Sequence, residues 1–262
     1  EVEGNPPELV FRADTVAAVD PGQGAAFREG GLWVVRPAVG REHTATVTTV
    51  ANRRILFIVL RREEALQAYA FELWGARRLA ISRSHLHADR GRLCCTSPGE
   101  RRISVSLFPA PEKNLQASIG AVEMKREGLF VTFSVDVPPY EPAVRVTRPF
   151  DRSALLNIDA DWPEHVSDVF LRVEYDGDVA AAWIGSRMVT DHIHYGKPWF
   201  IGLKQIRHEL GREMLHLDIT PLRRGDVRTF VNQAFVERFE GEEIAGFHRI
   251  AAIPHYEVRL MC

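Results

Sequence analysis

Short runs of alternating apolar and polar residues between Asp168 and Leu203 constrain the fold more than any other feature of this chain. In Val169–Tyr175 every second residue is apolar, which is the period of a β-strand. Asp176-Gly177 predicts a type I′ hairpin turn, because glycine adopts the positive φ of this turn without steric cost. Gly185-Ser186 predicts a second turn. Further strands are expected at 179–184, 187–192 and 200–203. The stretch is typical of an antiparallel β-sandwich.

The rest of the chain repeats this strand-and-turn pattern and offers one segment with helical spacing. Arg61–Ala70 places its apolar residues on one face and two glutamates in the first turn, which predicts a short helix. The βα alternation that a parallel α/β fold requires is absent from the sequence. His255–Leu260 predicts a closing strand of the kind that a jelly roll pairs near its first strand. We therefore predict an all-β fold in which helix is a small minority.

The length of 262 residues suits two domains better than one sandwich. We predict a β-sandwich-like domain at 1–112, connecting strands and a Pro-rich linker at 113–150, and a second sandwich of jelly-roll type at 151–262. The first ten residues, EVEGNPPELV, lack the basic start and apolar core of a signal peptide. We expect the chain to be a processed product or a piece of a longer one.

Charge, hydropathy and cysteine content argue against several classes of partner. A net charge of −2 gives no electrostatic reason to expect nucleic acid. No apolar run approaches the roughly 20 residues that span a bilayer. Adjacent Cys94 and Cys95 on a strand face opposite sides, and no CxxC spacing occurs. We predict no nucleic-acid or membrane partner, no metal site and no cofactor.

From Asp168 to Lys204 the chain carries the pattern D-x-F-L-x-x-x-Y-x-G-D-x-A, followed by an aspartate, an aromatic residue, a glycine, P-W and I-G-L-K. This segment resembles the C-terminal jelly-roll region of β-galactosidase-like glycoside hydrolases of family 35. Ala182-Trp183-Ile184 departs from the more polar strand of that pattern. The matching residues are Asp168, Leu171, Tyr175, Gly177, Asp178, Ala180, Asp191, Tyr195, Gly196, Pro198, Trp199, Ile201, Gly202, Leu203 and Lys204.

The resemblance implies a galactose-binding-like sandwich at 151–262 and an accessory role for the whole chain. Upstream, ILFIVLRREEALQAYAFEL is similar to a strand–helix segment of the module that precedes the jelly roll in such proteins. The catalytic part of that family is a (β/α)8 barrel with two glutamates, and such a barrel needs about 250 residues of its own. We therefore expect no catalytic residue in this chain and an upstream catalytic barrel of the same protein as its partner. The alternatives are a stand-alone carbohydrate-binding or adhesion module and an all-β enzyme that uses a histidine pair.

Carbohydrate sites combine aromatic ring faces with nearby polar groups that bind hydroxyls. The candidate carbohydrate contacts are the aromatic residues Trp183, Tyr195 and Trp199 and the polar residues Asp191, His194 and Lys197. The alternative for Trp199 is core packing. We favour packing, because Pro198 fixes the backbone before it and an apolar run follows it.

Two His-x-His pairs, His85/His87 and His192/His194, could each present two imidazoles on one side of a strand to a metal. Neither pair has a diagnostic third ligand, although Asp89 and Asp191 are nearby in sequence. The favoured alternative is that they are surface or hydrogen-bonded histidines. Carboxylate pairs such as Asp159/Asp161 are interpreted as solvated charges, because a retaining glycosidase needs two carboxyl groups about 5 Å apart across a substrate.

Overall fold

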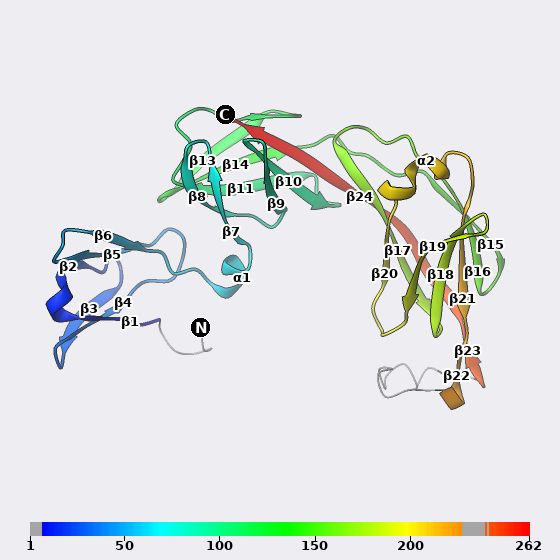
Figure 1. The fold of residues 1–262 in the computed structure, drawn as a ribbon, viewed down its shortest axis with the longest axis horizontal. Helices are drawn as coiled ribbons and strands as arrows, with labels where there is room; N and C mark the ends of the chain where they lie inside the picture. The colour runs from blue at the N-terminus through cyan, green and yellow to red at the C-terminus, as the bar shows by residue number, and fades with distance from the viewer. Residues whose placement is uncertain (1–6, 227–238, 240) are drawn as a thin grey trace. The chain divides into compact units, whose positions relative to one another are not determined.

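The computed structural model describes residues 7–226, 239 and 241–262, and its architecture is all-β (Figure 1). Strands make up 59% of it, in several antiparallel sheets of β-sandwich-like architecture, one of them curled into a half-barrel. The α-helices among the described residues are α1 (Arg62–Ala65) and α2 (Arg207–Leu210), each of four residues. The prediction of an all-β fold with little helix is confirmed.

The first of two compact units comprises 1–95, 102–136 and 258–262. It contains two three-stranded sheets, in the orders β1-β4-β3 and β2-β5-β6, and a five-stranded sheet in the order β13-β14-β11-β8-β7. These strands are β1 (Leu9–Arg12), β2 (Val16–Asp20), β3 (Ala25–Glu29), β4 (Leu32–Arg36), β5 (Ala45–Thr49), β6 (Arg54–Phe57), β7 (Ala68–Leu73), β8 (Ala76–Ile81), β11 (Arg102–Phe108), β13 (Val122–Glu127) and β14 (Phe130–Asp136). The remaining strands with residues in this unit are β9 (His85–Asp89), β10 (Arg92–Pro98), β12 (Gln116–Ala117) and the end of β24 (Gly246–Met261).

The second unit comprises 96–101 and 137–257. One of its sheets has the order β15-β16-β21-β18-β19, and the other contains β20, β17 and β24 side by side. The strands are β15 (Val144–Phe150), β16 (Ser153–Ile158), β17 (Val166–Asp176), β18 (Val179–Ile184), β19 (Arg187–Ile193), β20 (Trp199–Gly202), β21 (Leu215–Thr220) and β24 (Gly246–Met261). A short pair, β22 (Leu222–Arg223) and β23 (Glu243–Ile244), follows β21 in sequence.

The core of the second unit follows from the period-2 pattern of its strands. On β17, Leu171, Val173 and Tyr175 are at most 3% exposed, whereas the residues between them are half-buried. On β18, Ala180 and Ala182 are fully buried in the same alternating manner. One face of each strand thus faces the apolar interior and the other remains available for polar groups.

One of the two predicted hairpin turns is confirmed and the other is wrong. Gly185-Ser186 joins β18 to β19, which pair antiparallel with Ile184 opposite Arg187. Asp176-Gly177 does not close a hairpin, because β17 pairs with β20 and β24 whereas β18 pairs with β19 and β21. The chain therefore crosses from one sheet to the other at Gly177. A turn signal reports a reversal of direction and not which sheet the next strand joins.

The predicted helix over Arg61–Ala70 is only partly present. Helix α1 ends at Ala65, and Ala68 already belongs to β7, which pairs with β8 along its whole length. Pairing with an adjacent strand overrides a weak local helix preference. The predicted closing strand His255–Leu260 is the last part of the longer strand β24 (Gly246–Met261), which continues through Pro254.

The structure divides the chain at other positions than the predicted domain boundaries. Strands β13 and β14 lie in the segment 113–150 that was expected to connect two domains, and they pair with each other and with β11 inside the first unit. Strand β15 lies in the same segment and pairs with β16 in the second unit. Proline-rich composition therefore marks only the part of this segment between β14 and β15.

We predict that Gly177→Ala destabilises the protein by about 1–3 kcal/mol. Gly177 has a φ of 155°, and an added Cβ would overlap Cγ2 of Ile219 and lie 3.1 Å from the carbonyl oxygen of Thr220. Ile219 is buried and has little room to move. Gly211→Ala is the matched control, because no atom lies within 4 Å of its added Cβ. Urea unfolding of both variants tests this, and equal stabilities would contradict it.

Candidate functional site

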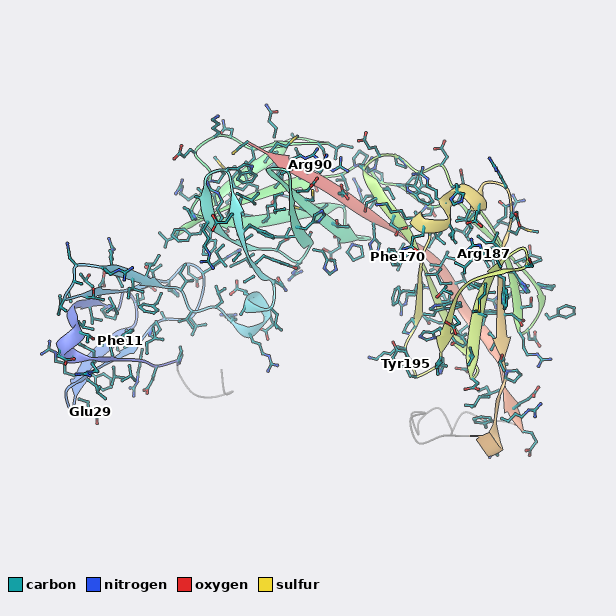
Figure 2. The ribbon with its side chains drawn as sticks, in the orientation of Figure 1. Phe11, Glu29, Arg90, Phe170, Arg187 and Tyr195 are labelled. Carbon is teal, nitrogen blue, oxygen red and sulfur yellow. The ribbon has the colours of Figure 1, made fainter. Side chains whose placement is uncertain are left out.

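The loop His194–Pro198 carries three of the six residues that the sequence proposed as carbohydrate contacts, His194, Tyr195 and Lys197. It leaves one sheet of the second unit at the end of β19 and enters the other at the start of β20. Gly196 adopts a φ of 84°, which explains a glycine at this position. Figure 2 shows Tyr195 on this loop, pointing away from the strands. The loop thus places the side chains of His194, Tyr195 and Lys197 between the end of β19 and the start of β20.

Trp199 lies in the core and not on the surface. It is 3% exposed and pairs with Val173 of β17. Its ring stacks on His192 at 5.9 Å between centroids and meets Tyr175 edge-on at 6.4 Å. The prediction that Trp199 packs in the core is confirmed, and its ring faces contact protein side chains instead of solvent.

Tyr175 ties the core to the strand that leads into the loop. Its hydroxyl donates to the carbonyl oxygen of His192 at 2.8 Å and lies 2.9 Å from Nδ1 of the same residue. Burial raises the pKa of Tyr175 above its ordinary value. Burial likewise lowers the pKa of His192, partly opposed by the charge of Asp191. Both shifts favour neutral side chains, so this pair serves packing and hydrogen bonding.

The other predicted residues fall in different places. His194 is 8% exposed and its ring lies edge-on to Tyr175 at 4.9 Å. Tyr195 is 55% exposed, with its ring 5.3 Å from that of His192. Asp191 is exposed on β19, opposite Ala181 of β18. The structure therefore brings His194 and Tyr195 together on one loop and leaves Asp191 on the neighbouring strand.

A pocket of about 360 Å³ lies beside this loop, wholly within the second unit. We call it the β17 pocket. Its charged and polar lining residues are Arg172, Glu174, Asp176, His194, Lys197 and His248. The volume lies at the lower end of the range for small-molecule sites and is large enough for one sugar ring.

The alternation of side chains along β17 explains the position of three of the lining residues. Arg172, Glu174 and Asp176 alternate with the buried apolar residues of β17 and therefore share its outer face. Arg172 Nη2 and Glu174 Oε1 form an ion pair of 3.0 Å. Among the described residues, Arg172 Nε is buried and has no hydrogen-bond partner. The outer face of β17 thus forms a charged floor for the pocket.

A β-bulge explains the position of a fourth lining residue, His248. Glu174 pairs with Arg249 of β24 and Tyr175 pairs with Phe247, so His248 is an extra residue in the ladder. Bulges re-aim side chains and are frequent near functional sites. Here the bulge brings His248 Nε2 to 2.8 Å from Asp176 Oδ2. The Asp176 side chain is 6% exposed and that of His248 is 49% exposed, so the imidazole is the accessible member of the pair.

Arg172, Glu174, Asp176 and His248 are lining residues that were not among the candidates predicted from the sequence. The i, i+2, i+4 spacing of the first three on a strand already places them on one face, and this signal was available. His248 had no such signal, because its position depends on a bulge that forms only when β24 pairs with β17.

The remaining motifs do not assemble into a site. His85 and His87 are both exposed on β9. Within the ranges that the structure describes, no group of three or more His, Cys, Asp or Glu residues is arranged to hold a metal ion. Asp159 Oδ1 accepts a hydrogen bond from the backbone N–H of Asp161 at 2.9 Å, which is a local turn.

Comparisons with protein-family models, curated proteins and solved structures found no match to this chain. Among the described residues, no helix has the length and apolar character needed to cross a membrane.

We predict that Trp199→Ala lowers the free energy of unfolding by about 3–5 kcal/mol, because it removes a large buried side chain. Tyr195→Ala is the control four residues away, and its exposed ring predicts a change within about 0.5 kcal/mol. Chemical denaturation of the two variants measures both values. A Trp199→Ala variant as stable as the parent would contradict the packing seen here.

Proposed function

We propose that this chain is the non-catalytic accessory region of a β-galactosidase-like glycoside hydrolase. Its second unit is then a galactose-binding-like jelly roll that supports an upstream catalytic barrel and contacts carbohydrate. The proposal is carried by the structural role of the residues that match the family pattern. Most of the matching residues whose contacts the structure describes hold the second unit together.

Asp168, the first residue of the segment that resembles the family, forms a hydrogen bond to Lys204, the last residue of that segment. Asp168 Oδ1 accepts hydrogen bonds from the backbone N–H groups of Val169 at 2.7 Å and Lys204 at 2.8 Å. A side chain at Gly202 would come within 3.2 Å of Asp168 Oδ2, so glycine permits this approach. The aspartate and the I-G-L-K motif thus join the β17 and β20 strands into one rigid element.

Gly177, Tyr175 and Trp199 also serve the framework. Gly177 allows the crossing between the two sheets, and the two aromatic residues fill the core beneath the loop. Catalytic groups must reach the substrate, whereas these residues are buried or confined to the backbone. A pattern whose residues maintain a scaffold supports an accessory role better than a catalytic one.

We assign the carbohydrate contact to the β17 pocket and to Tyr195, which lies on the same loop as the lining residues His194 and Lys197. An exposed tyrosine offers a ring face for stacking on a sugar, and the pocket offers both donors and acceptors for hydroxyl groups. This combination lies within one unit and needs no second chain. The same fact favours the alternative function, a stand-alone carbohydrate-binding or adhesion module. A reading frame that continues upstream of Glu1 into a barrel would favour the accessory role over this alternative.

We predict that the purified chain does not hydrolyse a chromogenic β-galactoside. The accessible carboxylate of the pocket, Glu174, is paired with Arg172, and Asp176 is buried against His248. Release of the chromophore is measured at high protein concentration. Turnover that co-purifies with the chain and disappears in Glu174→Gln or Asp176→Asn would show that the chain is an enzyme.

We predict that Tyr195→Ala weakens binding of a galactoside roughly tenfold, because the stacking surface is lost. Phe150→Ala is the control, since Phe150 is an exposed aromatic residue on β15 outside the pocket. Isothermal titration calorimetry with methyl β-galactoside compares the two variants. Equal affinities of Tyr195→Ala and the parent would remove Tyr195 from the site.

A further inference from the structure

We propose that the β17 pocket selects an acidic sugar, a pyranose that carries a carboxylate, over its neutral counterpart. This inference rests on the proposed carbohydrate contact and adds the class of sugar to it. Two observations carry it. Some charged groups of the pocket are already paired with protein groups, and others are accessible to a ligand.

The carboxylates of the pocket are largely committed to protein partners. Asp176 Oδ2 lies 2.8 Å from His248 Nε2 and the side chain is 6% exposed. Glu174 is paired with Arg172 at 3.0 Å and keeps a third of its side chain exposed. An entering ligand therefore meets one accessible carboxylate, which accepts hydrogen bonds from sugar hydroxyls, and not a cluster of negative charge.

The cationic groups of the pocket are less fully occupied by protein partners and can donate hydrogen bonds to a ligand. Lys197 is exposed, and within the described residues no ion pair involves its ammonium group. The Arg172 side chain is 39% exposed, and its ion pair with Glu174 is formed through Nη2. A carboxylate accepts from both kinds of donor, and such charge-assisted hydrogen bonds are stronger than neutral ones.

The backbone restricts where Lys197 can place its charge. Gly196 before it has a φ of 84°, and Pro198 after it has a fixed φ. Trp199 then anchors the loop in the core. A cation on a restrained loop loses less conformational entropy on binding than one on a free loop, so it can discriminate between ligands that differ by one charge.

Together these groups match a ligand with a carboxylate at one edge and hydroxyls at another. Lys197 and Arg172 would receive the carboxylate, and Glu174 would accept from a hydroxyl. A volume of about 360 Å³ accommodates one ring of this kind. A neutral sugar leaves the Lys197 charge without its partner, and a simple anion leaves Glu174 without a donor.

The test is isothermal titration calorimetry of the full chain with methyl α-galactopyranosiduronate and with methyl α-galactopyranoside. We expect the acidic sugar to bind at least tenfold more tightly than the neutral one, and this preference to shrink as NaCl is raised. Lys197→Ala should reduce the affinity for the acidic sugar about tenfold and leave the neutral sugar unchanged. Lys204→Ala is the matched control, because Lys204 is an exposed lysine of the same unit that lies outside the pocket. Thermal melts of each variant verify that it is folded.

The outcomes separate this inference from the proposed function. Equal affinity for the two sugars, unchanged in Lys197→Ala, would overturn the preference for acidic sugars and leave the carbohydrate contact intact. Binding of neither sugar would overturn both. Displacement of the acidic sugar by acetate at equal concentration would show a general anion site and overturn the sugar assignment. An equal loss in Lys204→Ala would place the charge effect outside the β17 pocket.

Discussion

The alternation of side chains along β17 is the constraint on which the rest of the second unit depends. Its inner residues, including Leu171, Val173 and Tyr175, are buried against the opposite sheet. Its outer residues Arg172 and Glu174 are partly exposed and line a pocket. One strand therefore supplies both the core and the floor of the candidate site, because successive side chains of a strand point to opposite faces.

The loop between β19 and β20 completes the candidate site, because it lines the same pocket as the outer residues of β17. Trp199 packs beneath it and Tyr175 bonds to His192 in front of it, so the loop begins and ends in the core. Buried aromatic contacts of this kind restrict motion and hold exposed groups in place. The exposed residues Tyr195 and Lys197 are thus carried by a framework that the buried residues maintain.

The bulge at His248 shows how a small irregularity changes the chemistry of a surface. Without the extra residue, β24 would continue its regular register with β17 past Glu174. With it, His248 lies 2.8 Å from Asp176 and occupies the accessible side of a buried carboxylate. The buried Asp176 carboxylate thereby has a polar partner, and the pocket keeps both donors and acceptors.

The sequence by itself determined the all-β class, the β18–β19 hairpin and the burial of Trp199, because strand period and turn propensity are local properties. Only the tertiary structure decided that the chain crosses between sheets at Gly177, that 61–70 is mostly not helix, and that His248 faces Asp176. Each of these depends on which distant strand becomes the partner. Strand pairing is selected by the packing of the whole sheet, and no local pattern encodes it.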